Sequence, residues 1–319
     1  MPKISVIIPA YNAKAHIDKC LTSIMEQTFN DFEVIIVNDG STDNTLELIN
    51  KYTNKDGRFI CYTQENNGQA AARNFAIEKA VGEYITFIDA DDYVENTMLE
   101  KLYLKMIEKG ADACACNIKT FGQKEITIKK MENKASNDKK NMMISDPGPT
   151  GCLIKRSIII DNELYFLEKH IYEDLAVVPL WWIYINKISC VDEELYYYLI
   201  HTGSIMKQEQ YDVKLEDIFD SINHLYKEFK KRDKENLYKE EVEYIYIKHF
   251  LHAASLRFFR FSDKEYLIIK IADIMKELFP NWKKNKYYKT EKFKYKVVCN
   301  LIYMKKLKLL KQVLKKDEK

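Results

Sequence analysis

Short apolar strands alternate strictly with helical segments along residues 1–110, and no other feature of the sequence constrains the fold as much. Four segments are rich in Ile, Val, Phe and Tyr, as buried strands are: residues 4–8, 32–37, 59–63 and 83–88. Strands and helices in this order predict right-handed βαβ units. The sequence therefore predicts an α/β domain, Rossmann-like, with a mostly parallel sheet and flanking helices on both faces.

The helices between these strands carry their own signals. Ile17, Leu21 and Ile24 recur at helical spacing after Asn12, which is expected to cap the first helix. Ser41 or Thr42 is expected to cap the second, in GSTDNTLELI. A third helix is predicted in the Ala-rich stretch GQAAARNFAIEKA.

Polar loops follow each of the four predicted strands. They are PAYN (9–12), NDGSTDN (38–44), QENNGQAAARN (64–74) and DADD (89–92). Ligands bind outside the carboxyl ends of the strands in a parallel sheet. Together these loops are predicted to ring a single crevice.

The DADD loop places Asp89, Asp91 and Asp92 within four positions. Such close carboxylates repel one another unless they are solvated, paired or bound to a cation. One interpretation is a turn that caps the next helix, a role suggested for Asp92. The other is a hard cation, Mn²⁺ or Mg²⁺, held by Asp89 and Asp91 together with the phosphates of a nucleotide. The position at the end of a strand favours the metal.

The pattern loosens after residue 111 and becomes purely helical after residue 211. ADACACNI is predicted to be a strand whose Cys114 and Cys116 pack on one face, and residues 122–147 a mobile flap or a two-stranded excursion. HIYEDLAVVPLWWIYI is typical of a loop leading into a buried helix. Beyond it, Ile218, Ile222, Leu225 and Phe229 keep helical spacing. Two domains are therefore expected, at 1–210 and 211–319.

Composition excludes several classes of protein. Hydrophobic residues make up 46% of the chain and charged residues 31%, and no apolar run approaches the roughly 20 residues of a membrane span. Seven cysteines form no CxxC pair, which argues against a disulfide framework or a zinc site. MPKISVIIPAYN indicates a first strand rather than a signal peptide, so a cytoplasmic location is expected.

The C-terminal region is strongly basic although the whole chain has a net charge of only +2. Residues 281–319 contain 14 Lys against one Asp and two Glu, a local charge of +11. Val297, Leu301 and the run 307–310 are predicted to form one face of a helix, with Lys on the other. Two roles remain open: contact with an anionic membrane surface, peripheral to the inner face of the cell membrane, or packing within the domain or a homo-oligomer. No recognition motif accompanies the charge, so nucleic acid is not expected as a partner.

Four motifs in order resemble the family 2 glycosyltransferases, whose catalytic domain has the GT-A fold. The resemblance covers about residues 1–205. Its motifs are SVIIPAYNAKAHIDKCLTSIMEQTFNDFEVIIVNDGSTDNT, NNGQAAARN, GEYITFIDADD and YED. It implies an inverting transfer of a sugar from a nucleotide-diphosphate donor, expected to be UDP-linked, to a hydroxyl of a glycan, lipid-linked or wall-polymer acceptor.

The resemblance also implies roles for individual residues. Asp174 would be the catalytic base, with Glu173 positioning the acceptor or a neighbouring donor group. Asp91 would bind the metal, with Asp89 by the ribose or in the metal shell. His201 would complete the metal shell and Ser204 would close over the diphosphate. The remaining donor-binding residues implied are Pro9, Tyr11, Asn12, Asp39, Asn67, Gly68, Arg73, Asp89 and Ala90. Physically, Tyr11 offers a stacking face, Asp39 an acceptor for a base N–H, and Arg73 a forked cation.

Two other functions fit the sequence less well. A nucleotidyltransferase would favour a Gly-rich, basic phosphate loop after the first strand, but PAYNAKAH has no Gly. A non-catalytic scaffold that binds nucleotide or glycan would be favoured by loss of the DxD or Glu-Asp pairs, and both are intact. Relatives often carry Trp and Lys where this chain has Thr150 and Cys152, so the resemblance does not extend to the acceptor.

Overall fold

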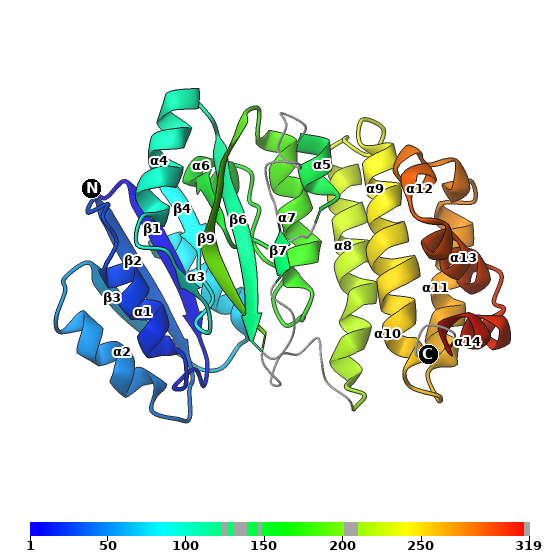
Figure 1. Cartoon of the computed structure of the whole chain (residues 1–319), viewed down its shortest axis with the longest axis horizontal. Coiled ribbons are helices and arrows are strands. Elements are labelled where there is room, and N and C mark those ends of the chain that lie inside the picture. Colours follow the sequence, from blue (N-terminus) through cyan, green and yellow to red (C-terminus); the bar gives the residue numbers. More distant parts are fainter. Residues whose placement is uncertain (123–126, 130–138, 146–147, 201–209, 316–319) are drawn as a thin grey trace. The chain divides into compact units, whose positions relative to one another are not determined.

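The structure of the 319-residue chain is a computed structural model that describes residues 1–122, 127–129, 139–145, 148–200 and 210–315. Its contacts divide it into two compact units, Met1–Gln210 and Tyr211–Lys319, here called unit 1 and unit 2. The division falls where the sequence changes from alternating strands and helices to helical spacing alone. Figure 1 shows the sheet with its helices in unit 1 and the helices of unit 2.

Unit 1 is built on one sheet with the strand order β3-β2-β1-β4-β8-β6-β9-β5, and β7 pairs with β6 outside this path. The strands are β1 (Ile4–Ala10), β2 (Phe32–Asp39), β3 (Phe59–Gln64), β4 (Tyr84–Phe87), β5 (Tyr93–Val94), β6 (Ala113–Gly122), β7 (Thr127–Lys129), β8 (Cys152–Lys155) and β9 (Ile188–Ile200). β1 is parallel to β2 and β4, and β2 is parallel to β3, which confirms the predicted βαβ units. β8 is antiparallel to both β4 and β6 and so ends the parallel half of the sheet.

Helices cover both faces of this sheet, as predicted. They are α1 (Ile17–Met25), α2 (Thr45–Thr53), α3 (Gln69–Lys79), α4 (Met98–Lys109), α5 (Lys139–Met143), α6 (Arg156–Ile160) and α7 (Glu173–Tyr184). Val6 and Ile8 of β1 pack in one core cluster with Leu21 of α1 and Leu102 of α4. Ile7 is equally buried but lies outside that cluster, because alternate residues of a strand point to opposite faces, and α3 packs against β1 and β2.

Two predicted helix caps are wrong. α1 begins after His16 rather than Asn12, and α2 begins after Asn44 rather than Ser41 or Thr42. Asn12, with a φ of 47°, instead accepts a hydrogen bond from the Thr42 backbone N–H at 2.8 Å. Asn12 therefore binds the loop after β2 rather than the start of α1, whereas Asp43 of that loop accepts from the Thr45 N–H at the start of α2, at 3.0 Å.

The region after residue 111 follows the prediction only in part, because Lys139–Met143 forms the helix α5. Cys114 and Cys116 of β6 are both fully buried in the core cluster, which confirms that they pack. Thr127–Lys129 forms β7, antiparallel to β6, so a two-stranded excursion is present, while residues 123–126 and 130–138 lie outside the described part. α7 is the predicted buried helix.

Unit 2 is helical throughout the part that the structure describes. Its main helices are α8 (Asp217–Lys231), α9 (Lys239–Ile245), the π-helical η3 (Tyr246–Ala254), α10 (Ser255–Phe259), α11 (Glu265–Leu278), α12 (Lys286–Thr290), α13 (Phe293–Tyr303) and α14 (Leu307–Lys315). Ile218, Ile222, Leu225 and Phe229 form the buried face of α8, as predicted. No described helix combines the length and apolar character needed to cross a membrane.

The predicted face of the C-terminal helix is wrong. The segment forms two helices, α13 and α14, separated by a turn in which Lys305 has a φ of 58°. Val298 and Ile302 of α13 are buried, whereas Val297 and Leu301 are only half-buried. The packing of α13 on α11 and η3 determines which of its residues are buried. The apolar spacing predicted Val297 and Leu301, each one residue before the residue that is buried.

Candidate active site

The four polar loops do lie along one edge of the sheet, because β3, β2, β1 and β4 are parallel neighbours. The loop after β1 binds the loop after β2: the Asn12 N–H donates to Ser41 Oγ at 3.0 Å, and Lys14 N–H donates to Asp43 Oδ2 at 3.3 Å. Tyr11 is 51% exposed beside these contacts, whereas Pro9 is buried within β1. This edge therefore carries the exposed ring of Tyr11 on a loop whose backbone is held by hydrogen bonds to the loop after β2.

Asp39, at the end of β2, fixes the loop after β3. Its Oδ1 accepts from Gln64 Nε2 at 2.7 Å and from the Asn67 N–H at 2.9 Å, and its Oδ2 accepts from the Gly68 N–H at 2.8 Å. The adjoining Gly40 has a φ of +68°, and a Cβ there would lie 2.7 Å from Asn66 N. The close approach of the two loops thus requires glycine. The predicted contact of Asp39 with a nucleotide base stays a prediction.

Arg73 joins two motifs that lie far apart in the sequence. It points from α3 with a side chain only 3% exposed. Its Nη2 donates to Asp89 Oδ1 at 2.7 Å, and its Nη1 donates to Glu173 Oε1 at 2.8 Å. The guanidinium also lies 5.1 Å from the ring centroid of Phe166. A buried cation paired with two carboxylates fixes the relative positions of the DADD loop and the start of α7.

The DADD loop is also held from its other side by β9. The Tyr196 hydroxyl donates to Asp92 Oδ2 at 2.6 Å and accepts from the Asp89 N–H at 3.2 Å. Asp92 Oδ1 accepts from the Leu199 N–H at 2.8 Å. Burial first, and then the charges of Asp89 and Asp91, raise the pKa of Asp92 well above its usual value. Asp92 does not cap the next helix, which begins at Met98 after Thr97.

The other two carboxylates of the loop, Asp89 and Asp91, are the predicted metal ligands. Asp89 and Asp91 are both half-buried, and Asp89 Oδ1 also accepts from Gln69 Nε2 at 3.0 Å. Among the described residues, no three His, Cys, Asp or Glu side chains are grouped to hold an ion. Mg²⁺ sites commonly use one or two carboxylates and complete the shell with substrate phosphates, so the oxygen donors present fit such an ion.

Glu173 and Asp174 begin α7, where the helix dipole favours negative charge. Asp174 Oδ1 accepts from the Leu175 N–H at 2.6 Å. Burial first, and then the charge of Glu173, raise the pKa of Asp174 to about 7, while the Leu175 N–H and Arg73 oppose the shift. A carboxylate with a pKa near neutrality is suited to general base catalysis.

Aromatic packing explains why α7 begins at this edge. Trp181 of α7 stacks on Phe87, the last residue of β4, with ring centroids 5.7 Å apart. Phe166 packs edge-on against both rings. Asn74 of α3 fixes Phe166 through two backbone hydrogen bonds, of 2.9 and 2.8 Å. Phe87, two residues before Asp89, therefore holds the helix that carries Glu173 and Asp174.

Several predicted residues do not join this network of side chains. His201 and Ser204 lie outside the described residues. Ala90 is buried and contributes backbone only. Sequence reasoning missed Gln69 and Tyr196, which both bind Asp89. Gln69 could have been found, because it lies inside the motif NNGQAAARN. Tyr196 could not, because it lies 107 residues from Asp89 and no local signal distinguishes it from its neighbours in LYYYLI.

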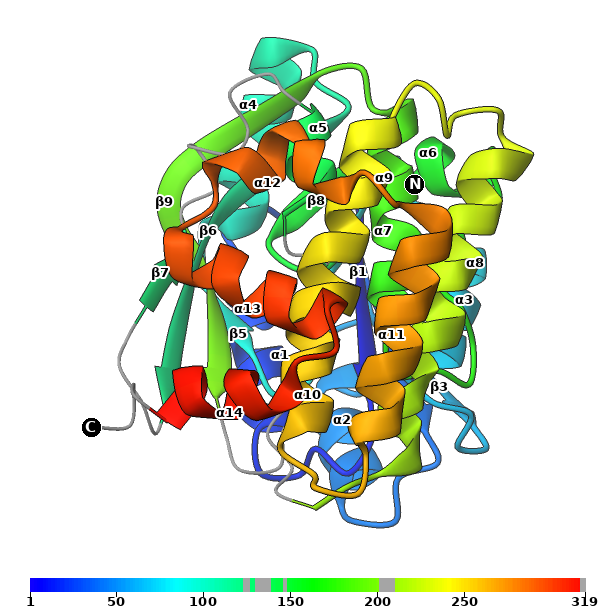
Figure 2. The ribbon, with the colours of Figure 1, turned by 90° about the vertical axis from the view of Figure 1, so that its right-hand side faces the viewer.

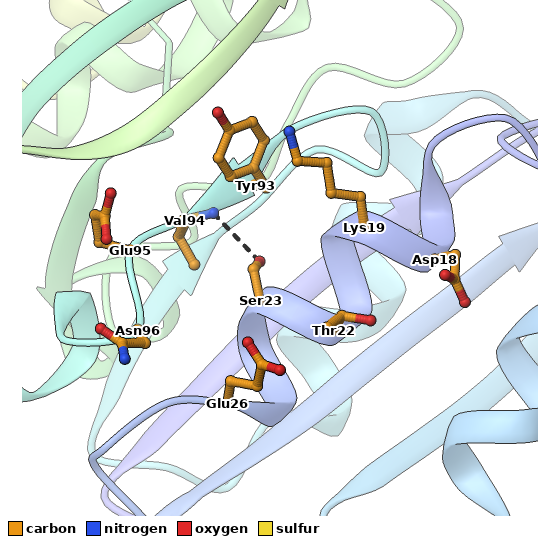
Figure 3. A pocket seen from close by; sticks show the side chains of 9 residues that line it. All are labelled: Asp18, Lys19, Thr22, Ser23, Glu26, Tyr93, Val94, Glu95 and Asn96. Atoms are coloured by element: carbon orange, nitrogen blue, oxygen red, sulfur yellow. Dashed lines mark hydrogen bonds between the residues drawn. The ribbon is translucent and has the colours of Figure 1, made fainter.

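A separate shallow cavity of about 580 Å³ lies between α1 and β5 (Figure 3). Asp18, Lys19 and Glu26 line it from α1, and Tyr93 and Glu95 line it from the β5 side. Lys19 Nζ lies 3.3 Å from the centroid of the Tyr93 ring, and Tyr197 stacks on that ring at 4.5 Å. The Tyr93 ring is therefore in contact with other side chains, and the cavity does not include the carboxylates that Arg73 joins.

Comparisons with known proteins place this arrangement in a family. The family model described as Glycosyl transferase family 2 matches residues 5–164. Glycosyltransferase GlyG of Streptococcus pneumoniae serotype 4 is 34% identical over 65% of this chain and 73% of its own. The poly(ribitol-phosphate) beta-N-acetylglucosaminyltransferase TarS of Staphylococcus aureus is 28% identical over 76% of this chain but only 43% of its own.

Solved structures show the same fold. TarS residues 1–349 in complex with UDP-GlcNAc superpose with a TM-score of 0.78 at 23% identity, over 98% of this chain and 90% of that one. The mannosyltransferase PcManGT of Pyrobaculum calidifontis, in complex with GDP-Man and Mn²⁺, gives a TM-score of 0.54 at 15% identity, over 95% and 87%. The chain belongs to glycosyl transferase family 2 and is a glycosyltransferase with the GT-A fold.

Proposed function

We propose that this enzyme transfers a sugar from a UDP-sugar to a hydroxyl of a glycan, lipid-linked or wall-polymer acceptor, with inversion at the anomeric carbon. The observation that carries the proposal is the pair of contacts of Arg73, to Asp89 at 2.7 Å and to Glu173 at 2.8 Å. They bring the carboxylates at the end of β4 next to Glu173 and Asp174. Donor phosphates and acceptor hydroxyl would thus meet along one edge of the sheet.

Asp174 acts as the base. It takes the proton of the acceptor hydroxyl while that oxygen forms a bond to the anomeric carbon. The bond from this carbon to the diphosphate oxygen breaks, and its electron pair leaves with the UDP. A half-buried carboxylate with a pKa of about 7 accepts a proton more readily than an ordinary Asp.

The other residues bind and orient. Tyr11, Asn12 and Asp39 line the nucleotide end, with the ring of Tyr11 exposed for stacking on a base. Asp91 and Asp89 would hold Mn²⁺ or Mg²⁺, and His201 would add a ligand from outside the described residues. Such an ion, when bound, neutralises charge on the leaving diphosphate. Arg73 and Tyr196 keep Asp89 in place from opposite sides.

UDP is the favoured nucleotide because TarS structures contain UDP and UDP-GlcNAc at a TM-score of 0.75 or above, and the TarS sequence is 28% identical over 76% of this chain. The polymer acceptor is proposed from the same relative, whose name specifies poly(ribitol-phosphate). A lipid-linked acceptor would place the enzyme at the inner face of the cell membrane.

The test is single-turnover transfer with a panel of UDP-sugars and short polyol-phosphate or glycan acceptors, comparing wild type with Asp174→Asn. Wild type should release UDP with at least one pair of substrates, and the variant should bind the same donor without turning it over. Asp161→Asn, at an exposed carboxylate at the end of α6, is the matched control and should keep full activity. Transfer by Asp174→Asn at the wild-type rate would contradict the assignment of the base.

A further inference from the structure

The C-terminal layer of unit 2 carries one sign of charge. The layer, residues 283–315, comprises α12, α13, α14 and their connections, and contains 12 Lys, no Arg and a single acid, Glu291. The rest of unit 2, residues 211–282, is nearly neutral, with 13 basic and 14 acidic residues, and unit 1 has a net charge of −8. Attraction to an anionic surface would therefore be local to this layer.

The layer is folded onto its own unit. α12 contacts α9, and α13 packs on η3 and α11, with α14 beside it (Figure 2). Tyr295 of α13 stacks on His252 of η3 at 4.1 Å, and Leu310 of α14 is fully buried. The apolar faces of these helices are thus already used within unit 2. What the layer presents to its surroundings is the opposite side.

Ten of the layer's lysines are exposed. Lys286 and Lys305 form ion pairs, with Glu241 at 3.1 Å and Asp273 at 2.6 Å. Lys306, Lys308 and Lys311 are exposed and form no ion pair with any described residue. Lys306, just before α14, and Lys308 and Lys311 within it can therefore interact with a partner through their full charge.

Large apolar side chains of the layer are also exposed. Phe293 is 82% exposed, Met304 51% and Leu309 46%. Phe293 lies between Lys292 and Lys294 in the sequence. Large apolar residues interleaved with lysine are typical of surfaces that enter the headgroup region of a bilayer.

We propose that this layer docks on an anionic lipid bilayer, with Lys306, Lys308 and Lys311 at the headgroups and Phe293 and Leu309 entering the interface. Lysine is a strongly hydrated point charge suited to a diffuse negative surface, whereas Arg is preferred for the planar recognition of nucleic acid. The core of a protein interface is depleted of charged residues, whereas this layer contains 12 Lys and one Glu. The proposal goes beyond the transfer reaction and holds whichever sugar is moved.

The test is co-sedimentation of the full chain with vesicles at low salt, using phosphatidylcholine alone or with about one third phosphatidylglycerol. Wild type should bind the anionic vesicles only, and added salt should release it. The triple variant Lys306→Gln/Lys308→Gln/Lys311→Gln should bind on the order of 100-fold more weakly, which corresponds to about 1 kcal/mol per lysine. Its matched control is Lys51→Gln/Lys55→Gln/Lys227→Gln, three exposed lysines outside the layer, with the same change of charge.

A second pair of variants tests the apolar contribution. Phe293→Ser/Leu309→Ser should weaken binding on the order of 10-fold. The control Leu104→Ser/Ile107→Ser, at positions of α4 that are 56% and 54% exposed, should not weaken it. UDP binding is measured on every variant as a separate test of the donor site. If the enzyme does not bind UDP, the vesicle result can still be interpreted. The proposal is overturned if wild type ignores anionic vesicles or if both lysine triples lose binding equally. It is also overturned if the layer variant dissociates an oligomer without changing vesicle binding.

Discussion

Charge is used in opposite ways at the candidate active site of unit 1 and in the basic layer of unit 2. At the site, Arg73 is 3% exposed and bound to two carboxylates, and Asp92 is 1% exposed and bound by a hydroxyl and a backbone N–H. In the layer, the charges stand exposed and largely share one sign. Buried, paired charges fix the positions of the groups that they join. Exposed charges act over about a Debye length, and salt screens them.

The largest effect is expected from removing the base. Asp174→Asn should lower the transfer rate about 10³-fold, within the range of about 10²–10⁴ typical of general base catalysis. Donor affinity should change little, since the variant keeps the size of the side chain. The measurement is the single-turnover rate at saturating donor. A rate within about threefold of wild type would mean that another group takes the proton.

The next effect tests the buried ion pairs of the site. Arg73→Met should destabilise unit 1 by about 3–5 kcal/mol, because Asp89 and Glu173 lose the cation that joins them. Arg58→Met is the matched control, because Arg58 pairs with Asp56 at a more exposed position and should cost only about 0–1 kcal/mol. Urea denaturation measures both. Equal costs would remove the distinction between the two kinds of charge.

The raised pKa of Asp174 predicts a dependence on pH. The group must be ionised to act as a base, so kcat/KM should rise with pH through about 7 and fall about tenfold per unit below it. A pH profile of kcat/KM at low donor concentration measures this. A profile that is flat between pH 5 and 8 would contradict the assignment.

The same pKa affects stability with a definite sign. Because the folded-state pKa lies above the ordinary Asp value of 3.8, stability falls as pH rises from about 4 to 7 and is then level. Asp174→Asn should therefore raise the Tm at pH 8 by a few degrees, and this gain should shrink at pH 5. A Tm gain that is the same at both values of pH would show that the Asp174 charge is not the cause.

The smallest effect concerns the hydroxyl of Tyr196. Tyr196→Phe removes one donor to Asp92 and the acceptor of the Asp89 N–H, and should cost about 1–3 kcal/mol in stability. Tyr266→Phe, at an exposed position of unit 2, should cost nothing measurable. Thermal unfolding followed by UDP titration separates stability from donor binding. An unchanged Tm for Tyr196→Phe would mean that the Tyr196 hydroxyl does not help to hold the DADD loop.

Local patterns predicted the parts of the fold that depend on neighbours in the sequence. The strand ends that carry Asp39 and Asp89, and the helix after Gly68, followed from apolar runs and polar loops alone. The helix caps and the phase of α13 did not, because loop-to-loop hydrogen bonds and packing on η3 override local preference. Spacing likewise gave no sign of the contact between Arg73 and Glu173, which are 100 residues apart.

The proposed transfer requires that the carboxylates at the end of β4 hold a metal and a nucleotide diphosphate. Calorimetric titration of UDP with and without Mn²⁺ tests this most directly, on wild type, on Asp91→Ala, and on Asp31→Ala as an exposed control. We expect binding by wild type and Asp31→Ala that requires Mn²⁺ and is lost in Asp91→Ala. Binding of UDP that needs no metal, or that survives Asp91→Ala unchanged, would contradict the account.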